Sequence, residues 1–429
     1  MSIIIRGGRP LEGSVRCYGA KNAALPIMAA ALLSDETSEI CNVPFLLDVD
    51  TMVSMLRATG SNVRYLGGSV HISPGQRLLH EAPHDLVRRM RASFLIMGPL
   101  LARCGAASVP LPGGCAIGRR PVDLHLKGFQ AMGADITMER GSIRASAKRL
   151  QGAEIYLDVP SVGATENIIM AASLAQGETV LENAAEEPEV VDLANFLNAM
   201  GADVKGAGTH RIRVTGVRRL KGVKYATIPD RIEAATFAIA AAITRGRVMI
   251  ENVIPTHLRS VLAKVKELGG HLREGPRWVE VSMSDRPLPT QVKTLPYPGF
   301  PTDVQAPFMS LCCIGKGTSI ISETVFENRF AHADELNRMG ARIRIEGSNA
   351  VIEGVERLEG ARVQASDLRA GAALCVAGLA AAGVTQIGGT GHIERGYSGL
   401  VEKLKGLGAD VTRVPDHPGD YLEVAPGWM

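Results

Sequence analysis

The sequence predicts an α/β protein of two similar domains, each built from three copies of a repeat of about 70 residues. Three observations support this prediction. A stretch of helical pattern that ends in glycine recurs six times, at intervals of 68 to 73 residues. Six alanine-rich apolar segments alternate with these stretches at intervals of 64 to 74 residues. Short runs of β type follow members of both series, and they alternate between polar and apolar residues as half-buried strands do.

The recurring glycines indicate one surface helix per repeat. A glycine just beyond the last helical residue can adopt the left-handed conformation that ends a helix. The runs that follow, such as 202–205 and 341–345, alternate between polar and apolar side chains. The glycines are Gly60, Gly133, Gly201, Gly269, Gly340 and Gly408.

The alanine-rich segments predict six buried helices, because they are apolar nearly all round rather than on one face. Each is followed by a run of β type, such as 38–43 or 248–253. One repeat is therefore a buried helix, a strand, an amphipathic helix and a strand pair. The segments begin near Lys21, Arg91, Thr165, Asp230, Asp303 and Asp367.

The six repeats are expected to form two closed clusters of three. A repeat cannot bury its apolar helix alone and must pack against its neighbours. Units this long and two-layered favour closed clusters over an open stack. The expected boundary is 225–229, just before the fourth buried helix, and residues 1–20 contribute sequence of β type.

Composition excludes several classes of protein. The chain has 429 residues, a net charge of +3, 46% hydrophobic residues and 21% charged residues. These values are ordinary for a folded protein and give no indication of nucleic-acid binding. The longest apolar runs, 23–33 and 370–384, are shorter than the roughly 18 residues that a membrane helix needs. Seven cysteines without a C-x-x-C pair favour a reducing compartment, and with no signal peptide we expect a cytoplasmic protein.

Polar residues at the starts of the apolar helices indicate an anion site. A helix N-terminus presents unpaired N–H groups and partial positive charge, so several converging starts would bind an anion. A simpler alternative is that the acidic and hydroxyl residues there are helix caps, namely Asp230, Asp303, Ser366 and Asp367. The cations at or near these starts are Lys21, Arg91, Arg231, Arg369 and, from loops, Arg120 and Arg395, with Asn22 beside Lys21.

The segment LPGGCAIGRRPVDLH at 111–125 is the strongest local signal. Its glycines and prolines are typical of an exposed loop. Arg119 and Arg120 would lower the pKa of the Cys115 thiol, which could then act as a nucleophile or an acid. The alternative is an incidental loop cysteine.

Motifs for bound cofactors are missing. The sequence has no phosphate-binding loop of the G-x-x-x-x-G-K-[ST] type and no dinucleotide fingerprint. It has no H-E-x-x-H motif or clustered His and Cys residues, so neither a cofactor nor a metal is expected. His125, His332 and His392 are scattered, and we interpret each as structural.

Nine stretches together resemble the enolpyruvyl transferases: GAKNAALP (19–26), MRAS (90–93), residues 111–125, SVGAT (161–165), PDRIE (229–233), FPTDVQ (300–305), ENRF (327–330), SDLRA (366–370) and HIERGY (392–397). The match runs essentially end to end. It implies two inside-out, barrel-like α/β domains of three pseudo-repeats each, with the active site in the interdomain cleft. It further implies that 1–20 join the second domain, giving domains 21–229 and 1–20 plus 230–429.

The resemblance also implies a reaction. The enolpyruvyl group of phosphoenolpyruvate would move to the 3′-hydroxyl of UDP-N-acetylglucosamine with release of phosphate, by addition and elimination through a tetrahedral intermediate. This is the first committed step of peptidoglycan synthesis. By similarity Cys115 is the general acid and Asp303 the base or orienting carboxylate, and fosfomycin would alkylate Cys115. The implied catalytic set is Cys115, Asp303, Lys21, Arg395 and Asp367, and phosphoenolpyruvate would contact Lys21, Asn22, Arg120 and Arg395.

Contacts to the nucleotide sugar follow from the same resemblance. One departure from some relatives is Val159, where they carry a lysine, and it removes a possible contact to the diphosphate. Glu327 and Arg329 match further positions that face the cleft. The implied contacts are Arg91, Arg120, Pro121, Val122, Asp123, Leu124, Val159, Pro160, Ser161, Val162, Asp303 and Val325.

Two other functions stay open at the level of sequence. One is a related enolpyruvyl transferase with another acceptor alcohol, against which the cysteine loop argues. The other is a catalytically silent homologue that only binds ligands. That hypothesis predicts loss of Cys115, Asp303 or Arg395, and the sequence retains all three.

Overall fold

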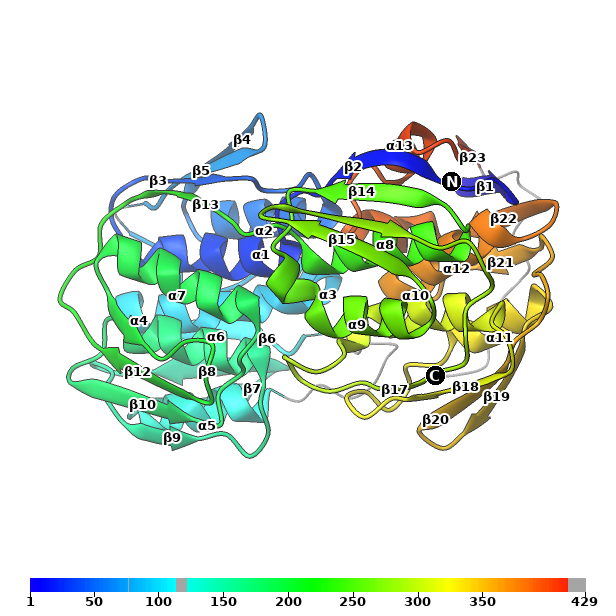
Figure 1. Cartoon of the computed structure of the whole chain (residues 1–429). Helices are drawn as coiled ribbons and strands as arrows, with labels where there is room; N and C mark the ends of the chain where they lie inside the picture. The colour runs from blue at the N-terminus through cyan, green and yellow to red at the C-terminus, as the bar shows by residue number, and fades with distance from the viewer. Residues whose placement is uncertain (76, 113–121, 416–429) are drawn as a thin grey trace.

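The computed structural model describes residues 1–75, 77–112 and 122–415. They form two lobes (Figure 1), and each lobe has a hydrophobic core of its own. One core draws on residues from Ala20 to Leu220, and the other on Ile3 to Cys17 together with Ile232 to Val411. The two-domain α/β fold predicted from the repeats is confirmed. No helix in the described ranges is both long enough and apolar enough to cross a membrane.

The first lobe contains three repeats. Its elements are α1 (Lys21–Ala30), η1 (Ala31–Leu33), β3 (Ser38–Cys41), α2 (Leu47–Ala58), β4 (Asn62–Leu66), β5 (Ser69–Ser73), α3 (His84–Arg89), η2 (Arg91–Ile96), α4 (Met97–Cys104), β6 (Ala106–Pro110), α5 (Asp123–Ala131), β7 (Asp135–Glu139), β8 (Ser142–Ser146), β9 (Glu154–Tyr156), α6 (Val162–Ala172), β10 (Glu178–Glu182), α7 (Pro188–Met200), β11 (Asp203–Lys205), β12 (Arg211–Thr215) and β13 (Lys224–Ala226).

The second lobe repeats the plan. Its elements are β1 (Ser2–Arg6), β2 (Glu12–Arg16), α8 (Arg231–Ile243), β14 (Arg247–Glu251), η3 (Pro255–Leu258), α9 (Arg259–Glu267), β15 (His271–Gly275), β16 (Trp278–Ser282), β17 (Gln291–Lys293), α10 (Thr302–Cys313), β18 (Thr318–Ser322), α11 (His332–Arg338), β19 (Arg342–Glu346), β20 (Asn349–Glu353), β21 (Arg362–Gln364), α12 (Leu368–Ala380), β22 (Val384–Gly388), η4 (Thr390–Arg395), α13 (Leu400–Gly406) and β23 (Asp410–Val414).

Helices fill the interior of each lobe and small sheets surround them (Figure 1). In the second lobe α8, α10 and α12 pack against one another, and their side chains are buried nearly all round. This arrangement inverts the usual barrel, in which strands are enclosed by helices. It places the N-terminal ends of the buried helices, rather than their sides, in positions where they can reach a ligand.

The order of the strands shows how the chain passes between the lobes. Strands β1 and β2 pair with β22, β23 and β14 of the second lobe, and β13 pairs with β3 of the first. The two crossings run side by side, since the N–H of Ala20 donates to the carbonyl of Ile228 at 2.7 Å. A side chain at Gly19 would lie 1.7 Å from the carbonyl oxygen of Asn42, so only glycine fits there. We propose 21–229 and 1–20 plus 230–429 as the limits of the domains.

The helix ends test the sequence patterns directly. All six helix-ending glycines have φ between 85° and 104°, which confirms the left-handed ends. Two of the predicted buried helices start differently. The second begins as the 3₁₀ turn η2 at Arg91 and becomes α-helical only at Met97. The third begins at Val162, ahead of Thr165, because the Ser161 hydroxyl accepts a hydrogen bond from the Ala164 N–H at 3.4 Å and caps the helix there.

Candidate active site

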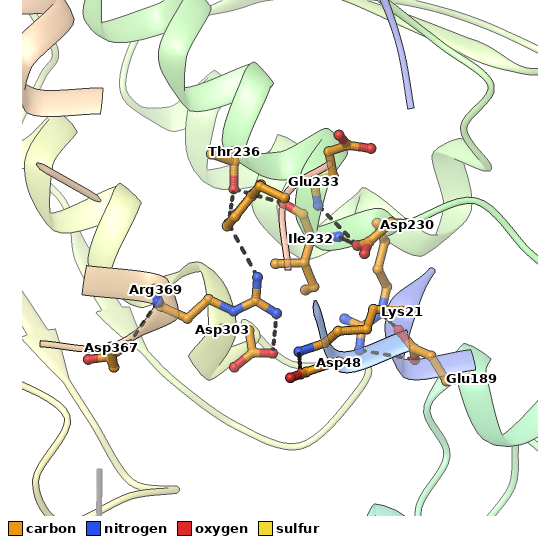
Figure 2. A network of polar contacts seen from close by, with 12 residues as sticks. Lys21, Asp48, Glu189, Asp230, Ile232, Glu233, Thr236, Asp303, Asp367 and Arg369 are labelled. Carbon is orange, nitrogen blue, oxygen red and sulfur yellow. Dashed lines mark hydrogen bonds and ion pairs between the residues drawn. The ribbon is translucent and has the colours of Figure 1, made fainter. Parts of the chain in front are cut away.

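Charged side chains from both lobes meet where the buried helices begin. Figure 2 shows Lys21, Asp48, Asp303 and Arg369 directed toward the same region from three buried helices and from α2. Lys21 is the first residue of α1, Asp303 lies in the first turn of α10, and Arg369 is the second residue of α12. Three of the buried helices therefore place charged residues of their first turns in one region.

Asp303 is held by two buried arginines. Its Oδ1 accepts from the Nη2 of Arg329 and its Oδ2 from the Nη2 of Arg369, each at 2.8 Å. The arginine side chains are 3% and 7% exposed, whereas that of Asp303 is 27% exposed. Burial alone would lower the pKa of Arg369, but the Asp303 carboxylate and other nearby groups raise it overall. The two arginines therefore fix the orientation of the Asp303 carboxylate, which stays partly exposed.

A second layer holds Arg369 in place. Its Nη1 donates to the Tyr397 hydroxyl at 3.3 Å, and its guanidinium stacks over the Tyr397 ring at 5.6 Å from the centroid. That hydroxyl also lies 2.8 Å from the hydroxyl of Thr236 on α8. Burial raises the pKa of Tyr397, so the phenol stays protonated. This support was not predicted from the sequence, because Thr236 belongs to the fourth repeat whereas Arg369 and Tyr397 belong to the sixth.

Lys21 and Arg395 contact one carboxylate from opposite lobes. The Nζ of Lys21 lies 2.9 Å from Asp48 Oδ2, and the Nε of Arg395 lies 2.8 Å from Asp48 Oδ1. Asp48 belongs to α2 in the first lobe, and Arg395 ends η4 in the second. Two of the three cations that the resemblance assigns to phosphoenolpyruvate are thus brought together, and Asp48 is a site residue that the sequence analysis missed.

The capping alternative is correct for two of its four residues. The Asp230 carboxylate accepts from the N–H groups of Ile232 and Glu233, and Asp367 accepts from those of Arg369 and Ala370. Asp303 is not the cap of α10, since Pro301 occupies that position, and its carboxylate pairs with Arg329 and Arg369. The Ser366 hydroxyl instead contacts the Asp367 carboxylate at 3.4 Å.

The residues implied for the nucleotide sugar lie mainly at two packed helix starts. Val122 precedes α5, whose first turn carries Asp123 and Leu124, and Ser161 and Val162 open α6. An ion pair of 2.8 Å between Lys127 and Asp158 joins these two regions. Val159 is 58% exposed and Pro160 is exposed beside it, Arg91 opens η2, and Val325 follows β18 in the other lobe with 37% exposure. Cys115, Arg120 and Pro121 lie outside the described residues.

Further residues from the sequence analysis have distinct surroundings. Asn22 and Glu327 are exposed, but Arg329 is buried and directed at Asp303 rather than outward. His125 lies 3.1 Å from the Asn167 amide and packs edge-on against Phe94. Burial, with Arg91 nearby, lowers the pKa of His125 to about 3, so it stays neutral. Burial likewise lowers the pKa of His332 to about 4.

A second ion pair between the lobes lies near the first. Arg231, at the start of α8, makes two hydrogen bonds to Glu189 of α7, at 2.9 and 3.2 Å. Both side chains are largely buried, at 11% and 4% exposure. Burial lowers the pKa of Arg231, but Glu189 and the neighbouring Glu187 and Asp303 raise it overall. The pair ties the lobes together, and Glu189 is the second charged residue that the sequence analysis missed.

Glu166, a buried residue of α6, allows a prediction about how the stability of the protein depends on pH. Burial raises the pKa of Glu166 well above its ordinary value of 4.5, and Glu189 and Glu187 raise it further. A raised pKa in the folded state stabilises the protein below about pH 4.5, and this stabilisation is lost as the pH rises through the folded-state value. We therefore expect Glu166→Gln to match the wild type at pH 4.5 and to melt about 3 °C higher at pH 8.

Thermal unfolding of both proteins between pH 4.5 and 9 measures this difference. Glu154→Gln, at an exposed position on β9, is the matched control and should shift the melting temperature by less than about 1 °C at every pH. A gap between Glu166→Gln and the wild type that does not grow with pH would show that Glu166 is not the titrating group.

The fold is similar to those of solved enolpyruvyl transferases. The structure resembles the enolpyruvyl transferase NikO from Streptomyces tendae with a TM-score of 0.86 and 26% identity, over 96% of this chain and 98% of that one. EPSP synthase from Acinetobacter baumannii has the same fold, with a TM-score of 0.74, 21% identity and coverage of 97% and 100%. By fold, the neighbours are enolpyruvyl transferases, as the sequence pattern indicated.

Sequence relatives are more specific. A family model described as EPSP synthase (3-phosphoshikimate 1-carboxyvinyltransferase) matches residues 5–404. UDP-N-acetylglucosamine 1-carboxyvinyltransferase 2 of Carboxydothermus hydrogenoformans is 58% identical, over 96% of this chain and 99% of its own length. UDP-N-acetylglucosamine 1-carboxyvinyltransferase 1 of Caldanaerobacter subterraneus is 55% identical with the same coverage. The chain belongs to the EPSP synthase family of enolpyruvyl transferases.

Proposed function

We propose that the protein transfers the enolpyruvyl group of phosphoenolpyruvate to the 3′-hydroxyl of UDP-N-acetylglucosamine and releases phosphate, at the first committed step of peptidoglycan synthesis. The observation that carries this proposal is identity of 51–58%, over nearly the whole chain, to relatives named for that activity. The gathering of cations and one oriented carboxylate at the helix starts supports it, because the donor carries both a phosphate and a carboxylate.

Lys21 and Arg395 bind the anionic end of phosphoenolpyruvate in this proposal, together with Asn22 and Arg120. Charge-assisted hydrogen bonds to phosphate and carboxylate are the strongest that side chains make. Lys21 also stands at the start of α1, whose first N–H groups have no side-chain cap. The helix terminus and the two cations together favour a multiply charged anion over a neutral ligand.

Asp303 and Cys115 carry out the proton transfers of the reaction. In the addition step the sugar 3′-oxygen bonds to C2 of phosphoenolpyruvate, the C3 methylene gains a proton and the hydroxyl loses one. In the elimination step the bond from C2 to the phosphate oxygen breaks, phosphate leaves, and the C3 methyl group loses one proton so that the double bond forms again. Cys115 supplies the proton to C3, and Asp303 orients the hydroxyl and accepts its proton. A donor and an acceptor held at opposite sides of the reacting carbon follow general acid–base logic.

Asp367 acts through the backbone. By capping α12 it fixes the first turn that carries Arg369, and thereby the orientation of Asp303. The nucleotide sugar contacts the first lobe at the starts of η2, α5 and α6. The residues involved there are Arg91, Arg120, Pro121, 122–124 and 159–162. Val325 contacts the sugar from the second lobe. Because Val159 carries no charge, the diphosphate depends more on Arg91 and Arg120 than it would in relatives that have a lysine at position 159.

Only small-molecule substrates are required for this activity, and we propose that the protein works in the cytoplasm. Phosphate release from phosphoenolpyruvate, measured with and without UDP-N-acetylglucosamine, tests the proposal. Release should depend on that sugar and yield a product heavier by one enolpyruvyl unit. Release that occurs with shikimate 3-phosphate and not with UDP-N-acetylglucosamine would overturn the assignment of the acceptor.

A further inference from the structure

Asp48 is buried between two cations of the proposed donor site, Lys21 and Arg395. Its residue exposure is 4%, and its two carboxylate oxygens are divided between Lys21 of the first lobe and Arg395 of the second. Within the described residues no other ion pair is formed by any of these three side chains. A single carboxylate therefore joins two cations from distant parts of the chain, since its contact to Lys21 spans 27 residues and its contact to Arg395 spans 347.

The backbone makes Asp48 the rigid member of this group. It lies in the first turn of α2, where the helix dipole favours a carboxylate, and its neighbours Leu46 and Val49 are buried at 5% and 3% exposure. Lys21 and Arg395 instead reach it through long side chains with many rotamers. When a short, fixed group contacts two flexible ones, the fixed group determines where the others rest.

The contacts leave donors available for a ligand. Arg395 uses its Nε on Asp48, so its two terminal nitrogens have no hydrogen-bond partner among the described residues. Lys21 uses one of its three N–H donors. With one carboxylate against two cations, the group keeps a net charge of +1. Asp48 thus occupies the Arg395 Nε–H and one N–H of Lys21 and leaves the other donors available, which is the arrangement of a positioning residue rather than of a substitute for the anion.

We propose that Asp48 is a positioning residue, which sets the separation of Lys21 and Arg395 between the lobes so that their remaining donors match the anionic end of phosphoenolpyruvate. This inference rests on the proposed function. The positioning role and simple electrostatics predict opposite effects on anion binding when Asp48 is neutralised. Removing a negative charge beside an anion site should tighten anion binding through space, whereas loss of positioning should weaken it.

Asp48→Asn and Asp48→Glu test the proposal in the full-length protein. For Asp48→Asn we expect the KM for phosphoenolpyruvate to rise about 10- to 100-fold, as misplacing binding groups by about 1 Å does. The KM for UDP-N-acetylglucosamine should change less than threefold. Asp48→Glu keeps the charge but moves the carboxylate, so it should restore no more than part of the loss. Asp50→Asn is the matched control, since Asp50 is exposed two residues away on the same helix.

Two outcomes would overturn the proposal. A KM for phosphoenolpyruvate that falls in Asp48→Asn would mean that Asp48 competes with the donor. A lower melting temperature with an unchanged KM would mean that Asp48 serves only stability. Binding of phosphoenolpyruvate, followed as a rise in melting temperature with UDP-N-acetylglucosamine present, reads the same contact without turnover. A wild type that binds the donor and releases no phosphate would overturn the proposed function while the Asp48 test stays readable.

Discussion

Asp303→Asn is expected to lower kcat about 10³-fold, near the middle of the range for loss of a positioned acid or base. The Asp303 carboxylate accepts hydrogen bonds from two buried arginines and still has 27% of its side chain exposed. An asparagine offers one oxygen, and its NH₂ group meets an arginine donor instead of accepting from it. The variant would lose both the base and the orientation that the two arginines impose.

The same change should reduce stability. Removing one partner of a buried ion pair typically costs about 3–5 kcal/mol, and the partial exposure of Asp303 lowers our expectation to about 2–3 kcal/mol. Chemical denaturation gives the free energy of unfolding, and steady-state kinetics at 25 °C gives kcat for the folded fraction. Asp334→Asn, at an exposed position in the first turn of α11, is the control. A kcat within threefold of the wild type would remove Asp303 from the reaction.

Arg395→Ala is expected to lower kcat/KM for phosphoenolpyruvate about 10²- to 10³-fold, as the loss of one preorganised charge-stabilising group does. Arg395 is the cation that the second lobe contributes beside Lys21, and η4 presents it to Asp48 across the lobe boundary. Without it the donor's anionic end contacts cations of the first lobe alone. Lys21→Ala should have an effect of the same order, because the two cations share the anion.

The effect should be specific for the donor. The KM for UDP-N-acetylglucosamine is expected to change less than threefold in Arg395→Ala. Arg413→Ala is a matched control, since Arg413 has 37% side-chain exposure against 38% for Arg395 and pairs with Glu394 at 3.0 Å. Equal losses for both substrates, or an equal loss in Arg413→Ala, would contradict the assignment of Arg395 to the donor.

Local patterns were enough to predict the repeat and most helix ends. Glycine at a left-handed position and aspartate at a helix cap are imposed by the backbone within a few residues, so Gly201 and Asp230 behave as their sequence indicates. The cations were also predictable, because charge at the start of an otherwise apolar helix has few structural explanations. Asp303 shows the limit of this reasoning, since its partners Arg329 and Arg369 come from other segments of the chain.

Asp48 and Glu189 could not be assigned partners from sequence, yet a signal was present. Asp48 shares the buried face of α2 with Met52 and Met55, four and seven positions later, and all three are at most 4% exposed. Glu189 shares the buried face of α7 with Leu193 in the same way. A carboxylate on the apolar face of a helix needs a buried cation. Only the folded structure shows that Asp48 pairs with Lys21 of its own lobe and Arg395 of the other, and that Glu189 pairs with Arg231.

The most direct test of the central claim is which bond of phosphoenolpyruvate breaks. Enolpyruvyl transfer cleaves the bond between C2 and the bridging oxygen, so phosphoenolpyruvate labelled with ¹⁸O at that oxygen should give phosphate that carries the label. Mass spectrometry of the released phosphate, after incubation with UDP-N-acetylglucosamine and protein, measures this. Labelled phosphate together with an enolpyruvyl ether of the sugar is the predicted result. Unlabelled phosphate and labelled pyruvate would mean cleavage at phosphorus and would contradict it.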